Sequence, residues 1–289
     1  MVLFVLFFLL LYLFIVKKIN EKIYIIIMQF TKEDIITTDK YATAFPMGYF
    51  KTDVIFSNTP MLWRDRIIHP PAQQLPILIS GHSDYGITDE IVDYYQPKIW
   101  FCVNKQTNKS NVFALPLGIT NNTNESELHP IYGNLDIMIN VMHETSVYKN
   151  WIYMNFNIDT FPTERKYVYD LFKDRDYVTI GETVNTLNGR IEFLREIKAH
   201  VFVLCPRGNG IDTHRLWETL YMGSIPILRR DIAYMDFIDL PICFIDDWNE
   251  INPSFLQKEK ERIVSQTWNM DKLKIGYWIY RIQQHYPNP

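Results

Sequence analysis

Cysteine is scarce in this chain of 289 residues, which contains only three, Cys102, Cys205 and Cys243. Their number is odd, and no two of them have the two-residue spacing of a CxxC motif. A disulfide framework and a structural zinc site therefore do not fit the sequence, because both need paired or closely spaced cysteines. We expect the three thiols to behave as small buried apolar groups.

The chain also lacks a surplus of charge of either sign. It has 29 Lys and Arg against 33 Asp and Glu, which gives a formal net charge of −4. No cluster of basic residues stands out, and a nearly neutral protein without such a cluster has no field that attracts a phosphate backbone. Nucleic acid is therefore not an expected partner.

Low-complexity tracts and internal repeats are missing as well, whereas apolar residues are plentiful. Hydrophobic residues make up 47% of the chain and charged residues only 21%. This composition excludes a disordered or collagen-like chain, because there is enough apolar surface to bury. At about 100–200 residues per domain, the length indicates two domains or one large one.

The amino terminus contains the longest apolar run. Residues 2–16 are uninterrupted apolar sequence, followed by Lys17 and Lys18 and by a second apolar run at 23–28. The first run is shorter than the about 17–25 residues of a spanning helix, so a span would need residues 17–22 near one interface or a locally thin bilayer. On that condition we interpret residues 1–27 as a candidate membrane anchor. The protein would then be membrane-associated and single-pass through residues 2–27, with either side of the membrane open. The alternative is that translation begins at Met28.

After residue 28, short apolar strands alternate with amphipathic stretches. In the first half we predict strands at 75–80, 98–103 and 111–116, with a helix at 88–95. In the second half we predict strands at 201–204, 225–228 and 242–245, with helices at 189–199 and 213–222. This alternation is typical of an α/β fold with parallel strands. We assign residues 28–165 to an acceptor-side domain and residues 166–289 to a carboxyl-terminal domain.

The densest functional signal is the segment 201–218, with the sequence VFVLCPRGNGIDTHRLWE. It runs from a predicted strand through two glycines into a helix, where free N–H groups and the helix dipole favour a phosphate. Arg207 and Arg215 add guanidinium groups that suit a diphosphate. A dinucleotide site is not indicated, because Gly208-x-Gly210-x-x-Thr213 lacks the third glycine of that fingerprint.

Glu218 lies three residues after Arg215 on the predicted helix. Its carboxylate can accept hydrogen bonds from ribose hydroxyls, or it can form an i,i+3 surface pair with Arg215. His214, at the start of the same helix, either contacts the diphosphate or packs against its neighbours. The candidate donor-site residues are Arg207, Gly208, Gly210, Asp212, His214, Arg215 and Glu218.

The same part of the chain resembles the exostosin-like glycosyltransferases. The match covers residues 201–250 and includes LWETL at 216–220, GSIPI at 223–227, FIDLP at 237–241 and DDW at 246–248. The resemblance implies a GT-B-type fold of two Rossmann-like α/β domains, the first of them reduced here. It also implies transfer of a sugar from a nucleotide sugar to a glycan or other hydroxyl acceptor, with inversion. In such an enzyme Arg207 would bind the diphosphate and Glu218 the ribose.

An inverting transfer needs a general base for the acceptor hydroxyl. We select His82 and Asp84, because their loop follows a predicted strand and ligands of open α/β sheets bind beyond the carboxyl ends of strands. The donor is expected to be a UDP- or GDP-sugar, with no cofactor and no metal, because the resemblance implies that basic residues and helix dipoles offset the diphosphate charge. The D-x-D sequence at 174–176 is interpreted as a solvated turn.

Two other functions remain open from the sequence. One is a non-catalytic, membrane-associated relative that binds a nucleotide sugar or a glycan. The other is a fucosyltransferase-like enzyme of GT-B type, which differs mainly in its donor nucleotide.

Overall fold

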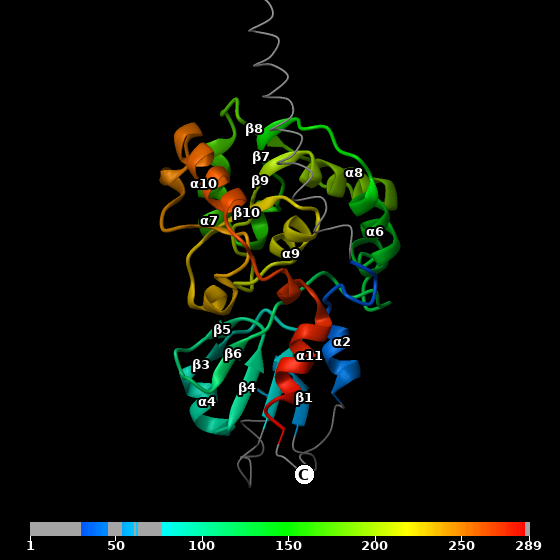
Figure 1. Cartoon of the computed structure of the whole chain (residues 1–289), viewed down its shortest axis with the longest axis vertical. Coiled ribbons are helices and arrows are strands. Elements are labelled where there is room, and N and C mark those ends of the chain that lie inside the picture. The colour runs from blue at the N-terminus through cyan, green and yellow to red at the C-terminus, as the bar shows by residue number, and fades with distance from the viewer. Residues whose placement is uncertain (1–29, 46–53, 61, 63–76, 287–289) are drawn as a thin grey trace, which may run out of the picture.

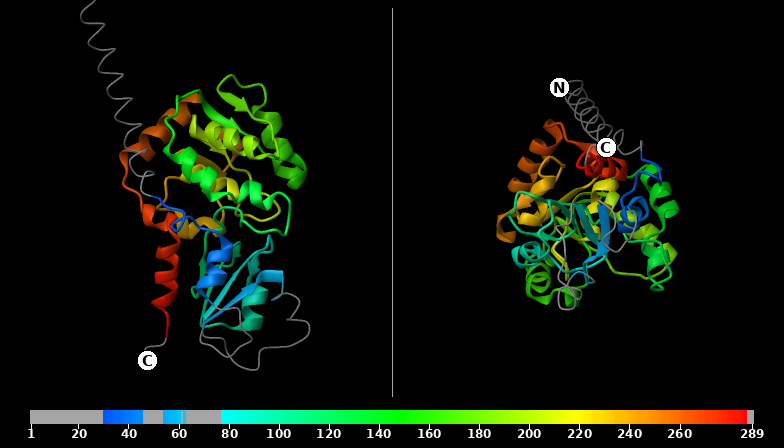
Figure 2. Two further views of the ribbon diagram at one scale, coloured as in Figure 1. Left: turned by 90° about the vertical axis from the view of Figure 1, so that its right-hand side faces the viewer. Right: turned by 90° about the horizontal axis from the view of Figure 1, so that it is seen from below.

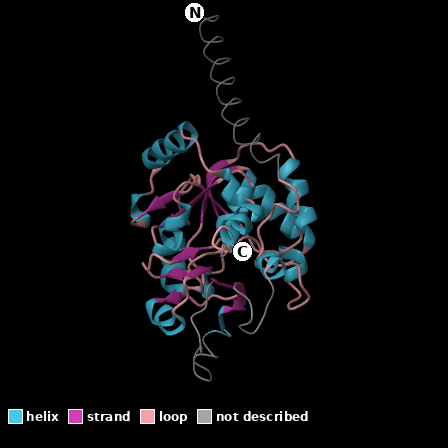
Figure 3. Ribbon diagram, turned by 60° about the horizontal axis from the view of Figure 1, so that its bottom comes forward, coloured by secondary structure: helices cyan, strands magenta, loops and turns pink. Residues whose placement is uncertain are grey.

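Two parallel β-sheets, each packed against helices, form the body of the protein (Figure 1). The computed structural model describes residues 30–45, 54–60, 62 and 77–286. In those residues the strands lie between helices, as Figure 3 shows by colour. The predicted α/β class with two parallel-sheet units is confirmed.

The candidate anchor, residues 1–27, lies outside the described residues. In the described part of the chain, no helix is long and apolar enough to cross a membrane.

The first sheet has four parallel strands in the order β1-β2-β4-β6. They are β1 (Val54–Asn58), β2 (Ile77–Gly81), β4 (Ile99–Cys102) and β6 (Val112–Ala114). Leu78 and Trp100 belong to one apolar cluster with α4 (Asp89–Tyr95), whereas Ile79 and Phe101 belong to another with α2 (Thr38–Ala44). Alternate residues of each strand are therefore buried on opposite faces. A small parallel pair, β3 (Ile87–Thr88) and β5 (Lys105–Gln106), lies beside this sheet.

The second sheet has five parallel strands in the order β11-β10-β9-β7-β8. They are β7 (Asn150–Met154), β8 (Val178–Ile180), β9 (His200–Leu204), β10 (Ile225–Arg229) and β11 (Cys243–Ile245). One face packs against α7 (Pro162–Phe172) and α10 (Pro253–Ser265), and the other against α8 (Leu187–Lys198) and α9 (His214–Tyr221). Strand β9 and helix α9 lie within one residue of their predicted bounds.

Shorter elements complete the second unit. Helices α5 (His129–Tyr132) and α6 (Leu135–His143) pack against α8. Short 3-10 helices are η1 (Ile158–Thr160), η2 (Ile232–Phe237), η3 (Trp248–Glu250) and η4 (Met270–Leu273).

The chain passes between the two units twice. Strand β7 pairs with β8 and β9, so the second unit already includes residues 150–154, which the sequence assigned to the first domain. The last helix, α11 (Ile275–Gln283), returns to the first unit and contacts α2, as Figure 2 shows. Beyond it, the ring of His285 lies 5.5 Å from that of Phe101 and 5.9 Å from that of Phe113. The division therefore differs from one between residues 165 and 166.

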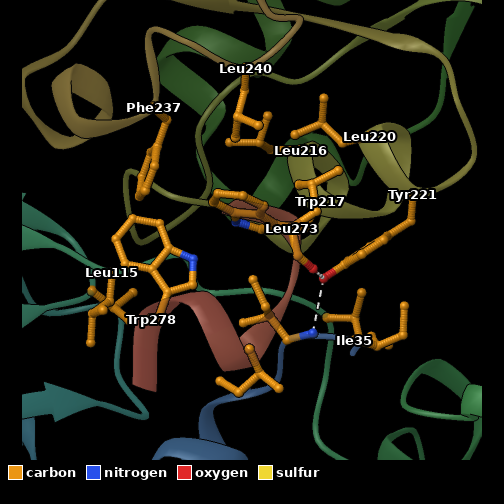
Figure 4. Packing of buried hydrophobic residues seen from close by; sticks show 14 of the residues in the cluster. Ile35, Leu115, Leu216, Trp217, Leu220, Tyr221, Phe237, Leu240, Leu273 and Trp278 are labelled. Carbon is orange, nitrogen blue, oxygen red and sulfur yellow. Dashed lines mark hydrogen bonds between the residues drawn. The ribbon is translucent and has the colours of Figure 1, made fainter. Parts of the chain in front are cut away.

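One apolar core joins the two units. Phe237 packs edge-on against Trp217 and Trp278, with ring centroids 5.1 and 5.7 Å apart (Figure 4). The Tyr221 hydroxyl accepts from the Ile36 amide at 2.9 Å and donates to the Leu273 carbonyl at 2.7 Å. All three cysteines are buried and unpaired, as predicted.

Candidate functional site

The carboxyl ends of both sheets meet at one cleft of about 600 Å³. On the first unit it is lined by the loops that follow β2 and β6, and on the second unit by the loops that follow β7 and β9. The strand order of the second sheet reverses between β7 and β9, because β8 lies on one side of β7 and β9 on the other. Open α/β sheets bind ligands at such a switch point.

Two glycines of the β9–α9 loop border this cleft. A Cβ on Gly210 would lie 2.8 Å from Asn104 Nδ2 and 3.1 Å from Asp84 Oδ1, and one on Gly208 would lie 3.2 Å from Arg165 Nη2. The loop leads into α9, whose preceding residue, Thr213, has a buried hydroxyl with no hydrogen-bond partner. The junction thus offers unused polar groups where a ligand can approach the main chain.

Arg215 and Arg165 line the same cleft from α9 and α7. Arg215 donates to the Asn155 carbonyl, and its guanidinium lies 4.3 Å from the centroid of the Phe193 ring. Arg165 donates to the carbonyls of Arg207 and Asn157, both at 2.8 Å, and has no carboxylate partner among the described residues. Burial, together with the charge of Arg215, lowers the pKa of Arg165 to about 10, so it stays charged at neutral pH.

Glu218 is held by two arginines. Arg190 Nη1 donates to its Oε1 at 2.6 Å, and Arg215 Nε lies 3.4 Å from its Oε2. Burial opposes ionisation of Glu218, but the charges of Arg190 and Arg215 outweigh it and hold its pKa below the usual range. The Arg215–Glu218 pair, one of the two alternatives that the sequence left open, is therefore present in the cleft wall, with the Arg215 side chain 21% exposed and the Glu218 side chain 5% exposed.

Asp212 and His214 connect the β9–α9 loop and the start of α9 to the first unit. Asp212 Oδ2 accepts from the Leu117 amide at 2.8 Å, and the Asp212 amide donates to Asn104 Oδ1 at 2.8 Å. Burial raises the pKa of Asp212 to about 7, against the opposing effect of the N–H groups of Leu117 and Trp217.

His214 Nδ1 lies 2.8 Å from the Gly118 carbonyl. A carbonyl only accepts, so Nδ1 carries the proton and Nε2 is an acceptor. Burial lowers the pKa of His214, which favours the neutral ring.

His82 and Asp84, the predicted base residues, line this cleft from the β2–β3 loop. Asp84 is exposed and lies beside Gly210. His82 Nε2 lies 3.3 Å from Asp39 Oδ1. The structure thus brings the predicted base loop and six of the seven predicted donor-site residues together.

Arg207 is the exception. Its guanidinium lies 4.6 Å from the Phe161 ring centroid and donates to the Asn209 carbonyl at 3.1 Å. It lines a second depression of about 400 Å³, together with Arg229 and Arg230, and not the cleft. Arg165 lines the cleft instead, beside Arg215, and its Nε donates to the carbonyl of Arg207 itself.

The sequence reasoning missed Arg165, Arg190 and Asn155. Arg190 had a visible signal, because it precedes Phe193, Leu194 and Ile197 at helical spacing and so lies in the apolar stripe of a predicted helix. A charged residue there needs a buried partner. No comparable sequence pattern marked Arg165 and Asn155, since only the pairing of β7 with β9 brings them to the β9–α9 loop.

The D-x-D residues, Asp174 and Asp176, are exposed in the turn between α7 and β8 and do not line the cleft. In the described ranges there is no group of three or more His, Cys, Asp or Glu side chains that could hold a metal.

Comparisons with known proteins give structural similarity alone. No family model matches the sequence, and no curated protein matches it. A crystal structure of an α1,3-fucosyltransferase is similar with a TM-score of 0.45 and 14% identity, covering 82% of this chain and 81% of that one. A crystal structure of an α1,3-fucosyltransferase with GDP-fucose has a TM-score of 0.41 and 10% identity, covering 85% of this chain and 94% of that one.

Proposed function

We propose that the protein is a glycosyltransferase that moves a sugar from a nucleoside-diphosphate sugar to a hydroxyl acceptor. The observation that carries this proposal is the meeting of Arg165, Arg215 and the unpartnered Thr213 hydroxyl at the switch point of a parallel sheet. Cationic forks, a glycine loop and a helix N-terminus together suit a diphosphate.

Two cations beside the β9–α9 junction suit this ligand. Arg165 and Arg215 line the cleft there, and the negative charge of Glu218 is offset by Arg190, which lies behind the cleft. A nucleoside diphosphate gains negative charge as it leaves the sugar, and fixed cations in a sheltered site stabilise that charge. In this proposal Arg165 takes the diphosphate role that the exostosin-like resemblance gave to Arg207. Glu218 keeps its ribose role through Oε2.

The acceptor lies on the side of the first unit. His82 and Asp84 stand on the β2–β3 loop, which lines the cleft from the first unit, and Asp84 lies beside Gly210 of the β9–α9 loop. One of them removes the acceptor proton while the acceptor oxygen bonds to the anomeric carbon and the nucleoside diphosphate departs from the opposite face.

Nucleotide binding tests the donor site. UDP, GDP and CMP, and their sugars, are added to the full chain, and the thermal midpoint is measured; one nucleotide should raise it by mass action. Arg165→Ala should abolish that shift. Arg207→Ala is the matched control and should keep the shift, because this arginine belongs to the β9–α9 loop but lies outside the cleft. No shift with any nucleotide in the wild type would refute the donor site.

The nucleotide preference and the presence or absence of turnover then distinguish the remaining alternative functions. A preference for GDP favours a fucosyltransferase-like enzyme, and a preference for UDP favours an exostosin-like one. Release of nucleoside diphosphate in the presence of a panel of glycans should occur in the wild type. It should be lost in whichever of His82→Ala and Asp84→Ala removes the base, while nucleotide binding remains. Binding without any turnover in the wild type favours the non-catalytic relative.

Membrane association through residues 2–27 belongs to the same proposal, because an anchored enzyme would act on acceptors at a membrane. Fractionation of the full chain and of a chain that starts at Met28 tests it. Only the full chain should sediment with membranes.

A further inference from the structure

His82 has a backbone conformation that is unusual for its residue type. Its φ is 58°, in the left-handed region, where a residue other than glycine is disfavoured. It follows Gly81, the last residue of β2, so the chain turns sharply at the carboxyl end of the strand. Such a conformation persists only when its surroundings hold it, and it is concentrated at functional sites.

Two neighbours fix the imidazole ring of His82. The ring of Phe56 in β1 meets it edge-on, with centroids 5.6 Å apart. Asp39 in α2 lies on another side, with Oδ1 at 3.3 Å from His82 Nε2. Nε2 is buried and makes no hydrogen bond of acceptable geometry, although this carboxylate is within reach. Because Nε2 is buried, Nδ1 is the ring nitrogen left for a ligand in the cleft.

Asp39 is itself held in place from the loop after β6. Its amide donates to Asn121 Oδ1 at 3.1 Å, and Asn121 Nδ2 donates to the hydroxyl of Thr38 at 3.0 Å. The first turn of α2 is therefore clamped to the loop that also lines the cleft.

The charged groups around the pair are few. Glu125, in the segment before α5, raises the pKa of Asp39, and His129, in α5, lowers it. Asp84 lies on the same loop as His82. Burial raises the pKa of Asp39, with an opposing effect from His82, so its carboxylate is a stronger hydrogen-bond acceptor than an exposed one.

We propose that Asp39 is a positioning residue for His82, and this rests on the proposed transferase function. In this proposal the 3.3 Å contact between His82 Nε2 and Asp39 Oδ1 aligns into a hydrogen bond donated by Nε2–H, which fixes that tautomer and leaves the Nδ1 lone pair facing the acceptor. As the acceptor oxygen bonds to the anomeric carbon, its proton moves to Nδ1, and the electrons of the breaking C–O bond leave with the diphosphate. The imidazolium that forms is stabilised by Asp39, as a carboxylate does for a histidine base in other enzymes.

The test compares Asp39→Asn with Asp136→Asn. Both residues are the second residue of a helix, α2 and α6, but Asp136 is exposed and lies outside the cleft. Asp39→Asn should lower kcat for nucleoside-diphosphate release by about 10²–10⁴-fold, the usual range for loss of acid–base assistance. The KM for the donor and the nucleotide-induced thermal shift should stay at wild-type values. Asp136→Asn should change none of these quantities.

The ¹⁵N spectrum of the imidazoles gives a readout that needs neither the acceptor nor turnover. The His82 signals are assigned by their loss in His82→Gln. In the wild type the proton should reside on Nε2, and in Asp39→Asn this preference should weaken.

A proton on Nδ1 in the wild type, or an unchanged kcat in Asp39→Asn, overturns the proposal. If no nucleotide binds to the wild type, the transferase proposal fails instead, and the tautomer still decides whether Asp39 orients His82. If Asp39→Asn does not fold, the wild-type tautomer decides alone.

Discussion

Arg190 Nη1 donates a hydrogen bond of 2.6 Å to Glu218 Oε1, and neither side chain is more than 5% exposed. The pair links α8 to α9 behind the cleft. Arg190 Nη2 also donates to the Tyr132 carbonyl at 3.0 Å, which connects α5 to the same pair. The carboxylate that we assign to the ribose is therefore fixed from three helices before any ligand arrives.

Removing Arg190 should be severely destabilising. Arg190→Met leaves the Glu218 charge buried without its shortest partner, and breaking a buried pair in this way costs about 3–5 kcal/mol. Urea denaturation measures the loss. Arg195→Met is the matched control on the same helix, because Arg195 pairs with Glu144 and Glu192 at the surface and its loss should be much smaller. Equal losses for the two variants would contradict the role of the buried pair.

Asp212 should make the stability of the protein depend on pH. Its pKa in the folded protein is raised to about 7 from an ordinary value of 3.8. The folded carboxyl therefore keeps its proton at pH values where the unfolded one has lost it, and this contribution to stability is complete below about pH 4 and lost as the pH rises to about 7.

The matched variant is Asp212→Asn, which has no carboxyl to titrate. The free energy of unfolding of the wild type, measured relative to this variant by urea denaturation, should fall between pH 4 and pH 7. Curves that stay parallel over this range would show that Asp212 is ionised throughout.

Gly118 should not tolerate a side chain. Its φ is 69°, and a Cβ there would lie 2.2 Å from the Ile36 carbonyl oxygen, a backbone atom. Gly118→Ala should lower the thermal midpoint, with a cost of at least about 1–3 kcal/mol from the backbone conformation.

Gly276→Ala is the control for Gly118→Ala. Gly276 is the second residue of α11, and nothing lies within 4 Å of the added Cβ. Gly276→Ala should therefore not lower the thermal midpoint, because alanine loses less backbone freedom than glycine on folding. If Gly118→Ala lowers the thermal midpoint by less than a typical substitution at the surface does, the loop after β6 rearranges around the added Cβ.

The β9–α9 junction could be predicted from sequence because all of its signals are local. A buried apolar strand, two glycines and an amphipathic helix follow one another within 201–222. Because these elements are consecutive in the chain, they are also neighbours in the structure, and the sequence predicts the β9–α9 loop that borders the cleft. The loop with His82 and Asp84 was found for a similar reason, because the end of β2 determines where its following residues point.

Arg165 and Arg207 show where the sequence reasoning failed. Arg207 belongs to the predicted motif, but its side chain turns toward Phe161, where it covers an aromatic ring. Arg165 belongs to α7, whose sequence contains no recognised functional motif, and it reaches the cleft only because β7 and β9 are neighbours. Side-chain direction within a loop and strand order within a sheet both depend on tertiary packing, which local patterns do not specify.

The return of α11 to the first unit sets the order in which this protein can be completed during synthesis. Ile282 and Trp278 are fully buried, and His285 packs against Phe101 and Phe113. The unit that leaves the ribosome first is thus finished last, after the whole second unit has been made. A premature stop before residue 275 would remove α11, and it would leave the earliest sheet with an open apolar face.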